Sequence, residues 1–368
     1  MLGNMPDTPT AESLETTRQV WSIPRAGSLA RLTLNSEPLA PPAEREVQVE
    51  VTAVGVNFAD VFACLGLYSA TPTGRFTPGL ECAGRVRCVG SGVVRWRPGD
   101  RVIVLTRFGG YATALNVHEE TLWPTPEDWT DAQAAAYPVQ ALTAWYGLTS
   151  LGNARRGAVV LVQSAAGGVG LNALQALQTL GARAVAVVGS AAKREWLIGQ
   201  YGLTAETVIV RSPRFADDLD AALASLGAGG FDLVFDAVYG ADFQPSFTRL
   251  AAEGRHVLFG AADFMSTGRR PNPFRLAWRY LRRPRLDPLA MISQNRGLLA
   301  FNLIWLWHEA SRLPDAMRGT LALIPRPPHI GGRYAFEDAH AALAAIQSGR
   351  TVGKLVLEPQ RASVARAE

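Results

Sequence analysis

Residues 158–193 read AVVLVQSAAGGVGLNALQALQTLGARAVAVVGSAAK, and this stretch contains the pattern that decides the fold. The apolar run Val159–Val162 predicts a buried strand, and three glycines follow it closely. Such glycines allow a tight turn and let the backbone approach a pyrophosphate at the N-terminus of the next helix. We therefore expect a dinucleotide site, formed here by Ala166, Gly167, Gly168, Val169 and Gly170.

The helix after this turn is indicated by leucines at a spacing of three, and it is expected to end at Gly181, a typical residue just past a helix end. The leucines are Leu171, Leu174, Leu177 and Leu180. A second apolar run, residues 184–188, follows at the distance expected of a βαβ unit.

The end of that second strand bears on which dinucleotide is bound. NAD-preferring sites hold an Asp or Glu roughly twenty residues beyond the glycines, where it binds the ribose 2′-hydroxyl. This chain has Gly189 and Ser190 there, with Lys193 and Arg194 close behind. Cations attract a 2′-phosphate and a carboxylate repels it, so the sequence favours NADPH. The alternative is that Ser190 only caps a helix and Lys193 is a solvated first-turn residue.

Length and composition set the broad class. A chain of 368 residues exceeds what one hydrophobic core usually supports, and we expect two domains. The formal net charge of +4 is mild and gives no case for nucleic-acid binding. Three widely spaced cysteines argue against a disulfide framework and for the reducing cytoplasm. No secretory signal or bilayer-spanning apolar segment is visible, so we expect a soluble protein.

The chain has two regions with different sequence patterns. After an expected disordered segment, residues 1–20, the first third reads as short β-strands separated by turn signals such as Pro98-Gly99-Asp100. From about Ala141 strands and helices alternate, which predicts a parallel, doubly wound sheet. Its expected strands are residues 158–163, 184–188, 207–210, 231–235, 256–259 and 298–306. Residues 336–346 then look helical, and residues 353–357 look like a returning strand.

Several short motifs resemble the quinone oxidoreductase branch of the medium-chain dehydrogenase/reductase superfamily. They are Gly55-Val56-Asn57-Phe58-Ala59-Asp60, Gly66-Leu67-Tyr68, Pro78-Gly79-Leu80-Glu81, Gly99-Asp100-Arg101-Val102 and Leu142-Thr143-Ala144-Trp145. The resemblance implies an α/β fold with a GroES-like, mostly β catalytic domain (21–140), a Rossmann NADP-binding domain (141–308) and a C-terminal return to the catalytic domain (309–368). Gly268-Arg269-Arg270 and Gln294-Asn295-Arg296 resemble the VAT-1-like subgroup.

Many members of this superfamily are zinc alcohol dehydrogenases, whose catalytic metal needs Cys, His and an open water position. The equivalent places here look like Asn57 and Leu80, which cannot replace a thiolate and an imidazole. The structural zinc of those relatives uses four closely spaced cysteines, and this chain has three dispersed ones. We therefore expect no metal.

Two residues are expected to contact the substrate. The resemblance implies that Asn57 contacts the nicotinamide or the substrate oxygen; the alternative is an asparagine that merely caps a turn. Tyr68 lies in a segment that supplies a tyrosine near the substrate in related enoyl-thioester reductases, and its hydroxyl could bind a carbonyl or donate a proton. The alternative is an interfacial tyrosine with no catalytic task.

Four further residues are expected near the cofactor, each with a plainer alternative. Thr143 resembles a threonine that approaches the nicotinamide amide, or it opens a helix. Arg211 takes a place where relatives often show a tyrosine beside the 2′-phosphate, or it faces water. Lys354 resembles a C-terminal position near the cofactor, or it lies at an exposed strand end. Gly260 lets a strand end approach the dinucleotide, or it forms a turn.

Residues 264–287 contain seven arginines together with aromatic residues. Phe274, Trp278 and Leu281 fall on one face of a predicted helix, and we expect this face to pack against the protein. The alternatives are a lid over the substrate cleft and contact with an anionic membrane.

Without a Lewis acid the chemistry should be hydride addition to an activated acceptor, which needs orientation, hydrogen bonds to a developing oxyanion, and a proton. We therefore predict an NADPH-dependent, zinc-independent reductase of quinones or α,β-unsaturated carbonyl compounds. The alternatives are an enoyl-thioester reductase and a catalytically weak, VAT-1-like NADPH-binding interaction protein. The apolar residues 298–306 could form an edge strand, and a homodimer joined through that edge is typical of the resembled family.

Overall fold

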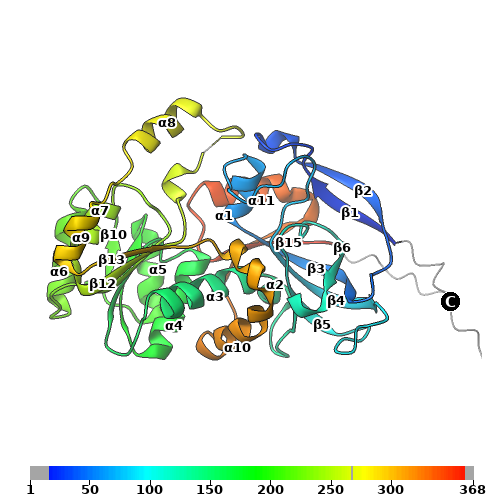
Figure 1. Cartoon of the computed structure of the whole chain (residues 1–368), viewed down its shortest axis with the longest axis horizontal. Helices are drawn as coiled ribbons and strands as arrows, with labels where there is room; N and C mark the ends of the chain where they lie inside the picture. Colours follow the sequence, from blue (N-terminus) through cyan, green and yellow to red (C-terminus); the bar gives the residue numbers. More distant parts are fainter. Residues whose placement is uncertain (1–15, 267, 361–368) are drawn as a thin grey trace, which may run out of the picture.

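The computed structural model describes residues 16–266 and 268–360, and Figure 1 shows two large sheets side by side. The first is a parallel sheet of six strands in the order β10-β9-β8-β11-β12-β13. Its strands are β8 (Val159–Val162), β9 (Arg183–Val188), β10 (Val208–Val210), β11 (Phe231–Asp236), β12 (Leu250–Leu258) and β13 (Gly297–Ala300). The order reverses between β8 and β11, which confirms the doubly wound sheet and marks the crevice where such sheets bind ligands.

Alternate residues of a strand point to opposite faces of the sheet, and the strands of this sheet are apolar on both faces. Helices therefore cover each face. Val160 and Val162 share one core with four helices, whereas Val159 and Leu161 share another core with two. The first group is α3 (Pro138–Trp145), α4 (Gly168–Leu180), α5 (Ala191–Tyr201) and α10 (Leu313–Leu323); the second is α6 (Phe215–Ser225) and α7 (Phe243–Thr248). The residues predicted to form the βαβ unit therefore do so, and α4 ends at Gly181 in the left-handed conformation.

The second large sheet is mostly antiparallel and has the order β14-β15-β3-β4-β5-β7, with β6 paired to β3. Its strands are β3 (Glu46–Val56), β4 (Glu81–Val89), β5 (Arg101–Leu105), β6 (Ala114–His118), β7 (Leu122–Pro124), β14 (Ile330–Ala335) and β15 (Lys354–Glu358). Three short helices accompany it, α1 (Phe58–Cys64), α2 (Asp131–Ala135) and α11 (Ala339–Gln347). Because β15 pairs with β3, the end of the chain returns to the sheet of the N-terminal region as expected.

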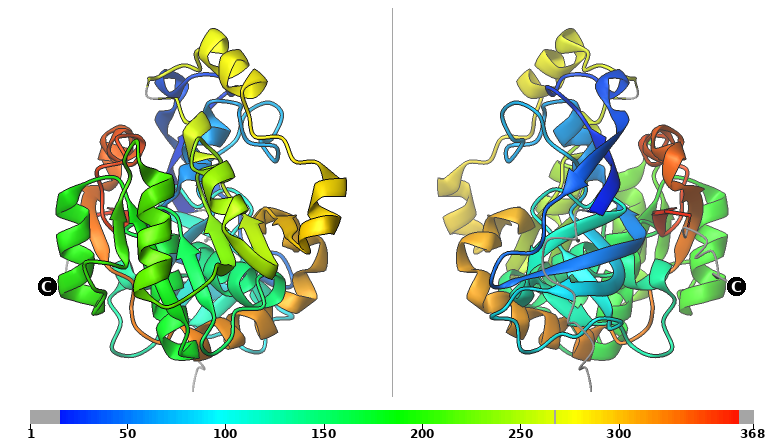
Figure 2. Two further views of the ribbon diagram at one scale, coloured as in Figure 1. Left: turned by 90° about the vertical axis from the view of Figure 1, so that its left-hand side faces the viewer. Right: turned by 90° about the vertical axis from the view of Figure 1, so that its right-hand side faces the viewer.

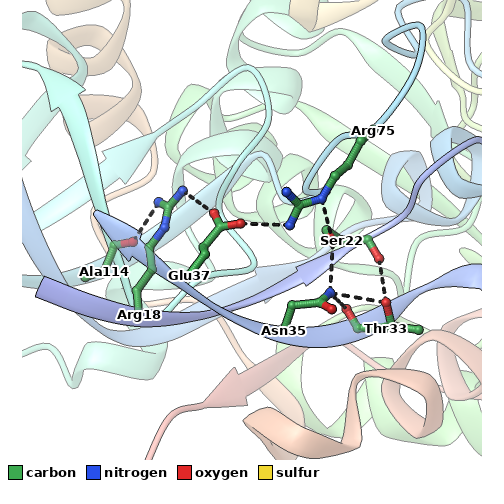
Figure 3. A network of polar contacts seen from close by, with 7 residues as sticks. All are labelled: Arg18, Ser22, Thr33, Asn35, Glu37, Arg75 and Ala114. Atoms are coloured by element: carbon green, nitrogen blue, oxygen red, sulfur yellow. Dashed lines mark hydrogen bonds and ion pairs between the residues drawn. The ribbon is translucent and has the colours of Figure 1, made fainter. Parts of the chain in front are cut away.

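The hairpin β1 (Thr16–Ser22) and β2 (Thr33–Leu39) precedes this sheet. Figure 3 shows how ion pairs fix it: Glu37 accepts hydrogen bonds from Arg18 at 2.8 Å and from Arg75 at 2.7 Å. Arg18 also donates to the backbone oxygen of Ala114 at 3.1 Å, so the hairpin is tied to β6. Residues 16–20, expected to be disordered, are thus part of a strand, and residues 1–15 lie outside the described residues.

The expectation that residues 298–306 supply the last strand is correct only at their start, and the expectation that the apolar helix face in residues 264–287 packs against the protein is wrong. Only Gly297–Ala300 forms the last strand, and the chain then turns into the 3₁₀ helix η6 (Leu303–Arg312). The predicted amphipathic helix forms as α8 (Pro273–Leu281), but its apolar face does not pack, since Phe274 is 86% exposed. In Figures 1 and 2, α8 lies at the outer edge of the molecule, and α9 (Pro288–Gln294) leads the chain back to β13.

The remaining short elements are η2 (Leu29–Arg31), η3 (Glu119–Thr121), the π-helical turn η4 (Tyr146–Leu151), η5 (Ala262–Phe264) and η7 (Phe336–Asp338). Among the described residues, no helix has both the length and the apolar character that spanning a bilayer requires.

Candidate active site

A cleft of about 520 Å³ separates the two large sheets at the carboxyl ends of the parallel strands. The parallel sheet contributes the turn after β8, the ends of β12 and β13, and Gly260. The opposite wall comes from residues around α1 and the loop after it, including Asn57 and Tyr68. Apolar side chains dominate the lining: Phe58, Phe62, Leu67, Leu80, Leu105, Phe259, Phe301, Leu303, Ile304 and Leu313. The cleft thus brings most of the predicted site residues together.

The glycine turn has the shape that a phosphate cradle requires. Gly168 begins α4, and no side chain of the described residues caps this helix end, so its backbone N–H groups can bind an anion. A β-carbon at Gly170 would lie 2.6 Å from the backbone of Ala165, so only glycine fits there without a shift. The C-terminal return fixes the turn, since Gly353 donates to the oxygen of Ala166 at 2.9 Å.

Gln140 lies over the same turn and was not predicted. Its side chain is buried in the cleft wall, and its carbonyl oxygen Oε1 accepts no hydrogen bond within the described part of the chain. A β-carbon added to Gly168 would lie 1.7 Å from this oxygen, which places the amide directly against the glycine turn. A buried acceptor without a donor is costly, and an amide group of a bound nicotinamide has the complementary chemistry. The turn and Gln140 therefore fit a dinucleotide.

The residues after β9 make several local contacts. Ser190 caps α5, as its hydroxyl accepts from the N–H of Lys193 at 3.4 Å. Lys193 is only partly exposed: its ammonium donates to the oxygen of Gly349 at 2.6 Å, and burial lowers its pKa. Lys193 is therefore more than a solvated first-turn residue. Among the described residues, no atom beyond the two chain neighbours of Gly189 lies within 4 Å of where its β-carbon would stand, so space is open beside it.

Arg211 does not simply face water. Its guanidinium forms an ion pair with Asp242 and donates to Oε1 of Gln163 at 3.2 Å. A contact with a 2′-phosphate would therefore compete with an existing carboxylate partner.

A buried charged cluster lies beneath Asn57. The ammonium of Lys354 forms an ion pair with Glu81 and donates to Oδ1 of Asn57 at 2.6 Å, and the side-chain amide of Asn57 donates to Glu81 at 2.8 Å. Glu81 also accepts from the N–H of Val139 at the start of α3. Lys354 is 1% exposed, so the alternative of an exposed strand end is wrong. Asn57 directly precedes α1, in the N-cap position, but its side chain is held by these two charges.

Asp60 and Tyr111 extend this cluster. One carboxylate oxygen of Asp60 accepts from the backbone N–H of Asn57 at 2.7 Å and from the Tyr111 hydroxyl at 3.1 Å. Its other oxygen is buried and has no partner among the described residues. Burial raises the pKa of Asp60 to about 7, and it raises the pKa of Tyr111 as well. Glu81 and Asp60 belong to the family-like motifs, but nothing in their sequence neighbourhood indicated that both are buried.

The raised pKa of Asp60 predicts a specific pH dependence. The folded protein binds this proton more tightly than the unfolded chain, whose carboxyl has the ordinary value of 3.8, so stability falls as pH rises from there to about 7. We expect Asp60→Asn to remove this part of the dependence in chemical denaturation at several pH values. Asp128→Asn at an exposed carboxylate is the control. An unchanged slope in Asp60→Asn would contradict the assignment.

Tyr68 and Thr143 take different places in the cleft. The Tyr68 hydroxyl donates to Oδ1 of Asn302 at 2.8 Å, which links the two walls. Burial raises the pKa of Tyr68 to about 12. Thr143 lines the cleft from within α3 rather than opening that helix, and its hydroxyl donates to the oxygen of Val139 at 2.6 Å. Asn302 was missed because residues 298–306 were expected to form a strand.

The described ranges contain no group of three or more His, Cys, Asp or Glu side chains that could hold a metal ion. Asn57 and Leu80 both line the cleft. The absence of metal from the chemistry stays a prediction from these two residue types.

Two family models match the chain: the alcohol dehydrogenase GroES-like domain over residues 43–127 and the zinc-binding dehydrogenase model over residues 203–357. The human synaptic vesicle membrane protein VAT-1 homolog is 33% identical over 338 residues, which cover 90% of this chain and 84% of that protein. Its zebrafish counterpart is 32% identical, but the match covers 65% of its length and 86% of this chain.

Solved structures show the same fold. The quinone oxidoreductase from Thermus thermophilus, also solved in complex with NADPH, is 30% identical, with a TM-score of 0.73 over 92% of this chain and 99% of that one. The CurK enoyl reductase is 25% identical, with a TM-score of 0.78 over 93% and 99% of the two chains. The chain therefore belongs to the medium-chain dehydrogenase/reductase superfamily of oxidoreductases, in the branch that includes quinone oxidoreductases and the VAT-1 homologues.

Proposed function

We propose that this protein is an NADPH-dependent reductase of quinones or α,β-unsaturated carbonyl compounds. One observation carries the proposal: the glycine cradle and the hydroxyl of Tyr68 border the same mostly apolar cleft. The lining around Phe62, Phe259 and Phe301 suits a planar apolar acceptor. The NADPH complex of the similar quinone oxidoreductase adds support.

When bound, NADPH supplies a hydride from C4 of its nicotinamide. The turn at Gly167–Gly170 would hold the pyrophosphate, and Gln140 would accept from the nicotinamide amide. The Tyr68 hydroxyl, protonated because its pKa is raised to about 12, would turn from Asn302 to the substrate oxygen and stabilise the charge that develops there. The polar atoms of Asn57 are engaged by Glu81 and Lys354, so this residue would shape the cleft floor.

Turnover with different acceptors tests the proposal. NADPH consumption is measured with a naphthoquinone, an enone and a crotonyl thioester, using the purified protein. The proposal expects turnover of the quinone or the enone. A clear preference for the thioester would support an enoyl-thioester reductase, which the similarity to CurK favours. Tight NADPH binding without turnover of any acceptor would contradict the reductase and favour a catalytically weak, NADPH-binding interaction protein.

Tyr68→Phe should lower kcat about a hundredfold with little change in KM, because it removes one donor to the developing oxyanion. Asn302→Ala should lower kcat only about fivefold, because it removes one ordinary hydrogen bond that positions the Tyr68 hydroxyl. Steady-state kinetics measure both effects. Tyr280→Phe, which changes an exposed tyrosine, is the matched control. Equal rates for Tyr68→Phe and the unaltered protein would remove Tyr68 from the mechanism.

Lys193→Ala should weaken NADPH binding about tenfold and leave NADH binding unchanged, because only NADPH carries the 2′-phosphate that the ammonium would bind. Titration of both dinucleotides, followed by nicotinamide fluorescence, gives the ratio. Arg194→Ala is the control, since the Arg194 guanidinium already donates to the oxygens of Ala205 and Val208. If the unaltered protein binds NADH as tightly as NADPH, the 2′-phosphate assignment fails.

We also propose a homodimer that joins two copies at the edge of the parallel sheet. Within the described residues β13 pairs only with β12, and Leu298 on it is 37% exposed. An unpaired apolar edge favours association with another strand. Light scattering at micromolar concentration should show a dimer; a monomer there would contradict this assembly.

A further inference from the structure

A buried polar pair lies near the carboxyl edge of the parallel sheet, outside the reaction described above. It consists of His256 on β12 and Asp236 at the end of β11, which are 0% and 1% exposed. Nε2 of the imidazole lies 3.0 Å from Oδ2 of the carboxylate. A carboxylate only accepts hydrogen bonds, so Nε2 carries the hydrogen and donates it. The pair therefore links two neighbouring strands close to the candidate active site.

Packing alone does not explain this pair. The ring centre of Phe243 lies 4.4 Å from that of His256, and the ring centre of Phe247 lies 6.1 Å away. An apolar ring would suit these neighbours better, because Nδ1 of His256 is buried and has no hydrogen-bond partner in residues 16–266 and 268–360. Buried polar pairs seldom add stability over apolar residues of similar volume. The hydrogen bond to Asp236 therefore calls for a role besides stability.

The other oxygen of Asp236 holds the turn that follows β11. Oδ1 accepts from the backbone N–H groups of Val238 at 2.7 Å and of Tyr239 at 3.2 Å. Tyr239 is in the left-handed region with φ 50°, a conformation that is uncommon for any residue except glycine. Such a conformation persists only where its surroundings fix it, and it is concentrated at functional sites. Asp236 fixes this turn, and His256 fixes Asp236.

The turn held in this way forms part of the cleft wall. Ala237 lines the cleft together with Gly260 and Ala261, which follow β12. The oxygen of Ala237 accepts from the N–H of Ala262 at 3.0 Å, and a β-carbon added to Gly260 would lie 2.7 Å from the same oxygen. The turn and the segment after β12 are therefore closely fitted, and a displacement of one would displace the other. Both belong to the side of the cleft that contains the glycine cradle.

We propose that His256 is a positioning residue for the cofactor. By donating to Asp236 it fixes the turn at residues 237–240, so that this wall of the cleft meets bound NADPH in one arrangement. Neither side chain is among the described residues that line the cleft, so both act through the turn and not by contact with the reacting atoms. The inference rests on the proposed function, and it adds a pair of residues that the reaction itself does not use.

Four variants separate positioning from stability. His256→Leu removes the donor and leaves the buried carboxylate of Asp236 unpaired, whereas His256→Gln keeps a side-chain N–H donor. The double variant, His256→Leu with Asp236→Asn, removes the unpaired charge but leaves the new amide without a partner that orients it. Leu219→Ala is the control, because it opens a cavity in the core that contains Phe243 and Phe247 and leaves the polar pair intact.

Nicotinamide fluorescence measures NADPH binding, chemical denaturation measures stability, and steady-state kinetics with the enone give kcat/KM for NADPH. We expect His256→Leu to weaken NADPH binding about tenfold and to lower kcat/KM about a hundredfold. His256→Gln should stay within about fivefold of the unaltered protein in both quantities. The double variant should recover stability while its NADPH binding stays weak. Leu219→Ala should lose stability and bind NADPH unchanged.

Three results would overturn the inference. They are NADPH binding that recovers together with stability in the double variant, unchanged binding and turnover in His256→Leu, and equally weakened binding in Leu219→Ala. The binding measurement keeps these results distinct from a failure of the proposed function. If the unaltered protein binds NADPH but reduces no acceptor, the reductase proposal fails, and weak binding by His256→Leu and by the double variant still supports the role of His256. If the unaltered protein binds no NADPH, both proposals fail.

Discussion

Replacing Lys354 with methionine is expected to lower the free energy of unfolding by about 3–5 kcal/mol, because it leaves a buried carboxylate without its countercharge. Lys354 and Glu81 are 1% and 0% exposed, so water cannot replace the missing partner. The same change removes the donor that holds Oδ1 of Asn57. Chemical denaturation measures the loss of stability, and the cleft floor should lose its fixed geometry with it.

A double-mutant cycle separates the ion pair from the bulk of the two side chains. Glu81→Gln with Lys354→Met should be more stable than Lys354→Met alone, since no buried charge is then left unpaired. The chain offers one matched control, its only other lysine: Lys193→Met removes a partly exposed ammonium with a single hydrogen bond to Gly349. That variant should lose no more than about 1 kcal/mol. Equal losses at Lys354 and Lys193 would contradict the importance of the buried pair.

Gly170→Ala is expected to lower kcat/KM for NADPH about a hundredfold, because a displacement of about 1 Å at the cofactor has an effect of this size on catalysis. The new β-carbon would stand 2.6 Å from the backbone of Ala165 and Ser164, and backbone atoms yield less easily than a flexible side chain. The turn would therefore move away from the pyrophosphate. Nicotinamide fluorescence and steady-state kinetics measure the change.

Gly199→Ala is the control for the replacement of a glycine by alanine. Gly199 is an exposed residue within α5, and in residues 16–266 and 268–360 no atom beyond its own stretch of helix lies within 4 Å of its added β-carbon. This variant should gain roughly 0.5–1 kcal/mol of stability, because alanine favours a helix interior more than glycine does, and it should bind NADPH unchanged. If Gly170→Ala also binds NADPH unchanged, the cradle at Gly167–Gly170 is not the pyrophosphate site.

The parallel sheet could be predicted because its signals are local. Val159–Val162, the glycines after it and the leucines of α4 specify a strand, a turn and a helix by periodicity and backbone freedom alone. The doubly wound order follows from repetition of such units. Where periodicity was ambiguous the predicted strand was too long: residues 298–306 are mostly apolar, and only Gly297–Ala300 pairs with a neighbouring strand, β12.

The cluster under Asn57 could not be predicted because its members lie far apart in the chain. Lys354 is 273 residues from Glu81, and the two come near each other because β15 pairs with β3 and β3 pairs with β4. The family resemblance indicated a position near the cofactor for Lys354, but nothing in the sequence indicated that its side chain is buried. The prediction that the apolar face of α8 packs against the protein was wrong for a different reason. The pattern of α8 is that of a packed helix, and the sequence could not show that this face is left exposed.

The most direct test of the reductase account is to follow the hydride itself. The purified protein is supplied with NADPH that carries deuterium at C4 of the nicotinamide, together with an enone, and the product is examined by mass spectrometry and NMR. The account predicts oxidation of NADPH with deuterium on the β-carbon of the reduced product, and strongly reduced transfer in Tyr68→Phe and Gly170→Ala. Binding of NADPH with no deuterium in the enone product, and with no oxidation of NADPH when a quinone is supplied, would contradict it.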